Sequence, residues 1–116
     1  MKQFFFLSSC LSRIFAVIIF CTSCTLAQQP KQWVTYAGGE GPGKGKHIVL
    51  ISGDEEYRSE EALPMLGKIL ALKYGFKCTV LFDVDPKIGH INVEALDNIP
   101  GLENLQTADL MVIFTR

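Results

Sequence analysis

The sequence has few cysteines, and it lacks the set of them that a disulfide framework requires. Three of the four, Cys10, Cys21 and Cys24, lie within the first 24 residues. Only Cys78 remains in the rest of the chain, inside a run of apolar residues. A single cysteine in such a run is predicted to be a buried thiol, so the fold is expected to depend on packing and not on cross-links.

The chain also lacks an excess of positive charge. Its formal net charge is −1, and without Lys2 and Arg13 in the apolar N-terminal part, 9 basic and 12 acidic side chains remain. Nucleic-acid-binding domains present a basic face to the phosphate backbone. We therefore expect no nucleic-acid partner.

No uninterrupted apolar run has the length that is typical of a membrane-spanning helix. Residues 14–20 (IFAVIIF) are uncharged, but Arg13 precedes them and a span needs ~20 apolar residues. Basic residues before this run, and the small residues of CTSCTLA after it, are typical of an export signal that is cleaved after Ala27. Residues 1–27 are therefore predicted to be a signal peptide, with a membrane anchor as the alternative.

Cys24 leaves a second processing route open. It follows Thr22-Ser23 as the lipid-bearing cysteine of a bacterial lipoprotein would, although Cys21 stands where such sites usually carry leucine. The protein is expected to be periplasmic or secreted, with a lipoprotein as the alternative. Any membrane contact would then come through the signal or through lipid on Cys24.

The arrangements that bind nucleotides or accept a phosphoryl group are missing too. The loop after the apolar run 48–52 has one glycine, Gly53, followed by three carboxylates at 54–56 that would repel phosphate. The near P-loop in 38–45 precedes that run instead of following it, and Gly45 replaces the Ser or Thr of a P-loop. The aspartate of a phosphoacceptor receiver domain is missing from the end of the last apolar run. No cofactor is therefore expected.

No nucleophile or metal site is predicted. The serines near the acidic loop have no histidine close by in the sequence. The carboxylates at 54–56, with Asp83 or Asp85, offer the oxygen ligands that hard cations prefer, but adjacent loop residues rarely all face inward. We therefore predict no metal, and we expect His47 and His90 at the surface.

Residues 28–46 (QQPKQWVTYAGGEGPGKGK) are predicted to be a linker. Five glycines surround Pro42, a composition that supports neither helix nor strand. Trp33 and Tyr36 are expected to pack this linker onto the domain that follows.

Residues 47–116 alternate between strand and helix patterns. Short apolar runs rich in β-branched residues predict strands buried on both faces, and apolar residues repeating every three to four positions predict a helix. The predicted elements are strand 48–52, helix 59–74, strand 78–84, short helix 102–106 and strand 109–115. This order indicates an α/β fold with a parallel sheet, helices on both faces and right-handed connections. Three strands are too few to close such a domain, so 47–116 is predicted to be the N-terminal part of a larger, truncated one.

The longer predicted helix has clear signals at its ends. Ser59 is expected to cap its N-terminus. Glu60 and Glu61 suit the positive end of the helix dipole, and Gly75 is expected to end the helix.

The carboxyl ends of the predicted strands mark the expected ligand site. In an open parallel sheet, ligands bind beyond these ends, where the strand order reverses. With the order 2-1-3 for the three strands, that point lies between strands 48–52 and 109–115. The chain delivers residues 53–58 and Thr115-Arg116 there. The carboxylates after the first strand therefore lie at the expected site.

The run HIVLISGDEEYRSEEALPMLGKILALKYGFKCTVLF, with NIPGLENLQTADLMVIFTR after a loop, resembles the ThuA-like family, which is linked to trehalose utilisation. The resemblance covers roughly residues 33–116, and it is to an exported branch of the family. It implies a flavodoxin-like, class I glutamine amidotransferase-like three-layer fold, of which this chain holds the first three strands. It also implies an extracytoplasmic role in carbohydrate metabolism, on trehalose or a keto-sugar derivative, without a nucleotide.

The resemblance extends to individual residues of the predicted site. The matching positions are Gly53, Asp54, Glu55, Tyr57, Arg58 and Glu60 in the first motif, and Thr115 and Arg116 in the third-strand motif. On this hypothesis, one of Asp54, Glu55 and Glu60 serves in acid–base catalysis. The substrate is bound by the other matched residues, Gly53, Tyr57, Arg58, Thr115 and Arg116. Glutamine amidotransferase activity is not expected. The alternative to an enzyme is a non-catalytic sugar-binding or scaffold domain.

Overall fold

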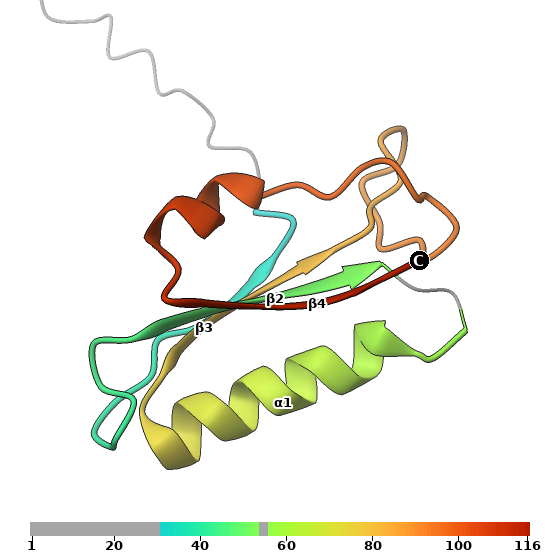
Figure 1. Cartoon of the computed structure of the whole chain (residues 1–116). Coiled ribbons are helices and arrows are strands. Elements are labelled where there is room, and N and C mark those ends of the chain that lie inside the picture. The colour runs from blue at the N-terminus through green and yellow to red at the C-terminus, as the bar shows by residue number, and fades with distance from the viewer. Residues whose placement is uncertain (1–30, 54–55) are drawn as a thin grey trace, which may run out of the picture.

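The chain folds as an α/β structure with one mixed sheet (Figure 1). The computed structural model describes residues 31–53 and 56–116. Its elements are β1 (Val34–Tyr36), β2 (His47–Gly53), α1 (Ser59–Tyr74), β3 (Lys77–Phe82), the 3-10 helix η1 (Leu102–Thr107) and β4 (Leu110–Thr115). The predicted α/β class is confirmed, and so is the predicted order of the three longer strands and the two helices.

The sheet has the strand order β1-β3-β2-β4. Strand β2 is parallel to both β3 and β4, with Ile48 opposite Cys78 on one side and Leu110 on the other. Every residue of β2 is buried, because the strand has neighbours at both edges and side chains packed on both faces. The three parallel strands thus have the order on which the predicted site depends.

The antiparallel edge strand β1 corrects the prediction that residues 28–46 hold no strand. Val34 pairs with Val80 and Tyr36 with Cys78. The glycines that prevent regular structure begin only at residue 38, and Val-Thr-Tyr before them is a β-branched and aromatic sequence that favours a strand. The predicted packing of Trp33 and Tyr36 is confirmed, since each contacts one of the two hydrophobic clusters.

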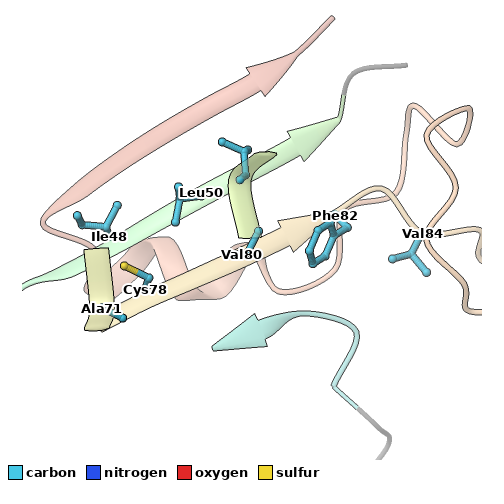
Figure 2. Packing of buried hydrophobic residues seen from close by; sticks show 8 residues of the cluster. Ile48, Leu50, Ala71, Cys78, Val80, Phe82 and Val84 are labelled. Carbon is cyan, nitrogen blue, oxygen red and sulfur yellow. The ribbon is translucent and has the colours of Figure 1, made fainter. Parts of the chain in front are cut away.

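Helices cover both faces of the sheet, as predicted (Figure 1). On the α1 face, Leu63 and Ala71 pack against alternate residues of β2 and β3. Figure 2 shows Ala71 beside these strands, with Ile48 and Leu50 on β2 and Cys78 and Val80 on β3. On the other face, Val49, Ile51 and Leu81 pack against Leu105 of η1 and its neighbours. The period-two alternation of the strands therefore divides the core into two layers.

The bounds of α1 are those predicted, but its N-terminal cap is not. The cap residue is Arg58, in the left-handed conformation at φ 52°, and no side chain accepts a hydrogen bond there. Ser59 is buried and shares a hydrogen bond of 2.8 Å with the hydroxyl of Ser52 on β2. Its hydroxyl therefore ties the helix to the sheet and does not cap it. Gly75, at φ 80°, ends the helix with its N–H donated to the carbonyl of Ala71, as predicted.

His47 is a buried residue of β2 and not the expected surface residue. Its Nδ1 lies 3.2 Å from the carbonyl oxygen of Thr107 and 3.1 Å from the hydroxyl of Thr107, and its Nε2 lies 2.9 Å from the hydroxyl of Thr79. Burial is the main cause that lowers the pKa of His47, and the charge of Lys77 lowers it further. His90 is exposed as predicted, and Cys78 is the expected buried thiol.

Strand β4 has a different environment from its neighbour β2. Most of its apolar side chains are exposed, on both faces of the sheet. The exposed ones are Leu110, Met111, Ile113 and Phe114. Within residues 31–53 and 56–116, no helix is long and apolar enough to cross a membrane.

Candidate functional site

The candidate site lies at the carboxyl edge of the sheet, where β2, β3 and β4 end together. Gly53 is opposite Thr115 in the register of β2 and β4. Asp83 follows Phe82, which is opposite Ser52, and its N–H donates to the Ser52 carbonyl at 3.1 Å. Asp83, Gly53 and Thr115 therefore form one row across three strand ends. We call this row the strand-end row.

The strand-end row lies on the η1 face of the sheet. Ile51 and Leu81 belong to the cluster on that face, and side chains two positions further along a strand return to the same face. This parity assigns Gly53 and Asp83 to it. Since the row crosses from β3 through β2 to β4, it includes the point between β2 and β4 where the strand order reverses.

Position 53, at the centre of this row, has room for glycine but not for a larger residue. A Cβ atom at position 53 would lie 2.8 Å from Oδ2 of Asp83 and 3.1 Å from Cγ2 of Thr115. The two neighbouring side chains therefore converge over the glycine. The carboxyl group of Asp83 occupies the space that any larger residue would need.

Asp83 is the most unusual ionisable residue of the edge. It is 3 % exposed, and its buried Oδ1 has no hydrogen-bond partner among residues 31–53 and 56–116. Burial, with a smaller contribution from the carboxylate of Asp97, raises the pKa of Asp83 to about 6. Sequence reasoning considered Asp83 only as a metal ligand. One sequence feature could have indicated Asp83 as a site residue. It is an aspartate that directly follows a predicted buried strand, at the same edge of the sheet as the glycine that ends the neighbouring strand.

Glu60, predicted to be catalytic, lies in the first turn of α1. The Ser52–Ser59 hydrogen bond holds this turn against the end of β2. Glu60 therefore lies at the same edge as the strand-end row but on the α1 face of the sheet, whereas the row lies on the η1 face. Oε2 of Glu60 is buried and has no hydrogen-bond partner in the part of the chain that the structure describes. A buried carboxylate oxygen without a partner is unusual in a folded protein, and here there are two at one edge.

Arg58 and Tyr57, predicted to bind substrate, point away from the buried part of the edge. Arg58 forms an ion pair with Glu61, one turn along α1, and both side chains are mostly exposed. Tyr57 is 70 % exposed. The structure therefore places these two residues on the outer surface of the loop, apart from Asp83.

Arg116 and Thr115 lie at the end of β4, as predicted. The N–H of Arg116 donates to the carbonyl of Gly53 at 3.3 Å, which continues the β2–β4 ladder. Its guanidinium group lies 3.3 Å from a carboxylate oxygen of Glu56. This ion pair joins the loop after β2 to the end of β4 across the point of strand reversal. Asp54 and Glu55, predicted to be catalytic, lie outside the described residues.

The chemistry of this edge is that of carboxyl, hydroxyl and guanidinium groups. These groups donate and accept hydrogen bonds in close proximity, as recognition of a polyhydroxylated molecule requires. Among the described residues, no three His, Cys, Asp or Glu side chains are grouped to hold a metal ion.

A hollow of about 350 Å³ opens at the opposite, amino edge of the sheet. Its lining includes the glycine-rich segment and Lys44, Lys46 and Lys77. Lys44 is paired with Glu40 and Lys46 with Asp109, so two of the three charges already have partners. The predicted site and this hollow are at different ends of the strands.

No protein-family model matches the chain, and no curated protein or solved structure matches it significantly.

Proposed function

We propose that the chain is a ThuA-like protein of carbohydrate metabolism that acts outside the cytoplasm, with a flavodoxin-like fold and a sugar site at the carboxyl edge. The motifs around Gly53 and Thr115-Arg116 support the family, and the export-signal pattern of residues 1–27 supports the location. The ligand class is a glycoside derivative such as trehalose or a keto sugar.

The strand-end row is the observation that supports a ligand site most strongly. It combines a glycine gap, a buried carboxyl group and a threonine at the position where open parallel sheets bind ligands. The Arg116–Glu56 pair adds a charged border on the β4 side. A neutral, hydroxyl-rich ligand suits this border better than a phosphate, because the carboxylates of the edge would repel an anion.

In the proposed enzyme, Glu60 is the acid–base residue among the described carboxylates. Among the described residues its Oε2 has no hydrogen-bond partner, and in this proposal a proton or hydroxyl group of the ligand supplies one. Thr115 and Arg116 hold ligand oxygens from β4, and Asp54 and Glu55 remain acid–base candidates through the family resemblance. Arg58 is the weaker of the two proposed arginine contacts, because it points outward to Glu61.

The test is binding and turnover of sugars by the full chain and by two variants. Methyl glucoside, trehalose and their 3-keto derivatives serve as probes, with binding followed by calorimetry and turnover by chromatography. Glu60→Gln should abolish turnover, and Thr115→Val should weaken binding. Glu103→Gln, a matched change on the exposed surface of η1, should alter neither. Failure of the unmodified chain to bind any of these sugars would refute the proposal.

A non-catalytic sugar-binding domain is the second candidate. The observation that favours it is that both arginines of the motifs already have carboxylate partners, Glu61 and Glu56, as in a preformed binding surface. Binding without conversion of any probe, unchanged by Glu60→Gln, would select this candidate.

A further inference from the structure

We propose that Asp83 is a ligand-binding residue of the carboxyl-edge site, and that its protonated carboxyl group donates a hydrogen bond to an oxygen of the sugar. This inference rests on the proposed function, and it assigns a role to a residue outside the family motifs. It also predicts which sugar oxygens are preferred. A carbonyl oxygen only accepts hydrogen bonds, so a keto sugar needs the protonated acid, whereas a hydroxyl group can pair with either form.

The position of Asp83 supports this role. Its carboxyl group extends over Gly53 towards Thr115, which directs it from β3 to the region where the strand order reverses. Its backbone is held on both sides, because its N–H donates to Ser52 and its carbonyl accepts from the N–H of Asn92 at 3.0 Å. The side chain thus has a fixed orientation although its Oδ1 has no partner in the described structure.

The lack of a partner is itself informative. A buried polar atom without a hydrogen bond is destabilising, and native proteins keep few such atoms. Neighbouring backbone groups satisfy Asp85 and Asn98 nearby in the same loop, so the fold can satisfy polar groups in this region. Among the described residues, Oδ1 of Asp83 has no hydrogen-bond partner, and it lies at the edge where a ligand is expected.

The charges around Asp83 favour its protonated form. Asp97, in the loop after β3, is the neighbouring carboxylate that disfavours a second negative charge. The other described charges near this edge are Glu60 on α1, Asp85 in the loop after β3, and two ion pairs, Arg58–Glu61 and Arg116–Glu56, in which each cation is already matched by a carboxylate. The described residue of β2 beside it, Gly53, has no ionisable group. No described cation is therefore committed to stabilising the ionised form of Asp83.

The experiment measures binding of methyl glucoside and of its 3-keto derivative at pH 5 and pH 7.5, with the full chain. Since a donor that titrates near pH 6 is mostly ionised at pH 7.5, binding of the keto sugar should weaken roughly 10- to 30-fold between these two pH values. Methyl glucoside should weaken less. A carbon-13 titration of the Asp83 carboxyl group, with and without the keto sugar, should show that the ligand raises its midpoint.

Two substitutions of Asp83 distinguish the effect of its hydrogen-bond donor from the effect of its ionisation. Asp83→Asn keeps a hydrogen-bond donor but cannot ionise, so it should retain keto-sugar binding and lose the pH dependence. Asp83→Ala removes the donor and should lose at least tenfold in affinity at pH 5, with thermal unfolding as the check on folding. Glu103→Gln is the control that should behave as the unmodified chain.

The possible results distinguish failure of this inference from failure of the proposed function. If Asp83→Ala binds the keto sugar as well as the unmodified chain, or if Asp83→Asn keeps the same pH dependence, Asp83 has no such role while the sugar site stands. If the unmodified chain binds neither sugar at either pH, both proposals are wrong.

Discussion

A single buried carboxyl group should make the stability of this protein depend on pH in an unusual direction. The pKa of Asp83 is raised to about 6 in the folded chain, above its ordinary value of 3.8. The unfolded chain therefore releases this proton at lower pH than the folded chain. The contribution of Asp83 to stability is fully present below pH 4 and is lost as pH rises through 6.

We predict that Asp83→Asn removes this loss. The variant should be more stable than the unmodified chain at pH 8, by up to about 3 kcal/mol for a pKa shift of two units, and close to it at pH 4. Urea unfolding at the two pH values measures the difference. A gain in stability of equal size at both would show that ionisation of Asp83 is not the cause.

His47 should have the opposite effect. Because its pKa is lowered in the folded chain, the unfolded chain binds the proton first, and the contribution of His47 to stability is lost as pH falls below 6.5. We predict that His47→Phe costs roughly 1–3 kcal/mol at pH 8, since Thr79 and Thr107 lose their partner, and flattens the acid side of the pH profile. His90→Phe, a matched change at an exposed histidine, should do neither.

Gly53 offers a steric test of the strand-end row. Gly53→Ala should destabilise the protein by roughly 1–3 kcal/mol, because the new methyl group would clash with Asp83 and Thr115. Gly39→Ala is the control, since a methyl group there would meet nothing within 4 Å. In the Asp83→Ala background the cost of Gly53→Ala should shrink. An unchanged cost would show that the carboxyl group does not occupy the space above the glycine.

The sequence indicated some of these residues as candidates and missed the properties of others. Motif matching named Gly53, Glu60 and Thr115 as candidates, because their types and spacing are visible in the chain. Asp83 acquires its character only from the strand register, which sets it level with Gly53, and from the loop that buries it. The burial of His47 depends likewise on Thr107, far away in the sequence and brought close by η1.

At the scale of elements, the buried stripe of α1 is what attaches the helix to the sheet. Leu63 is 4 % exposed and packs in the core, whereas Leu72, on the same helix, is 73 % exposed. We predict that Leu63→Ala costs roughly 2–4 kcal/mol, from lost burial and the cavity left behind. Leu72→Ala should change stability by less than about 0.5 kcal/mol. Comparable losses in the two variants, measured by urea unfolding, would contradict this packing.

Most elements were predictable because each has a strong local signal. The bounds of α1 follow from its apolar period and from Gly75, and the three parallel strands follow from continuous apolar runs. Strand β1 was missed because three strand-forming residues lie beside a glycine-rich segment that dominates the local composition. The cap of α1 was missed because serine favours that position by type, whereas here Ser59 is recruited by a buried partner, Ser52.

At the scale of the whole molecule, β4 is the surface most prone to self-association. It lies at one edge of the described sheet, and apolar side chains are exposed on both of its faces. Such an edge favours pairing with other strands. We predict that the chain associates as its concentration rises and that Ile113→Lys reduces this association without unfolding the protein. Analytical ultracentrifugation and circular dichroism provide the two measurements. Association that Ile113→Lys leaves unchanged would locate the contact elsewhere.

Strand β1 has a consequence for the order in which the protein can fold. It is synthesised before the rest of the described sheet, yet β3, its strand partner there, lies about 45 residues further along the chain. The segment that becomes β1 therefore has no strand to pair with until β2, α1 and β3 have been synthesised and have assembled. The glycine-rich segment that follows β1 is a flexible connection, and it allows β1 to pair with the edge of β3 once that strand is in place. The first part of the described chain to leave the ribosome is thus expected to be among the last to take its native place.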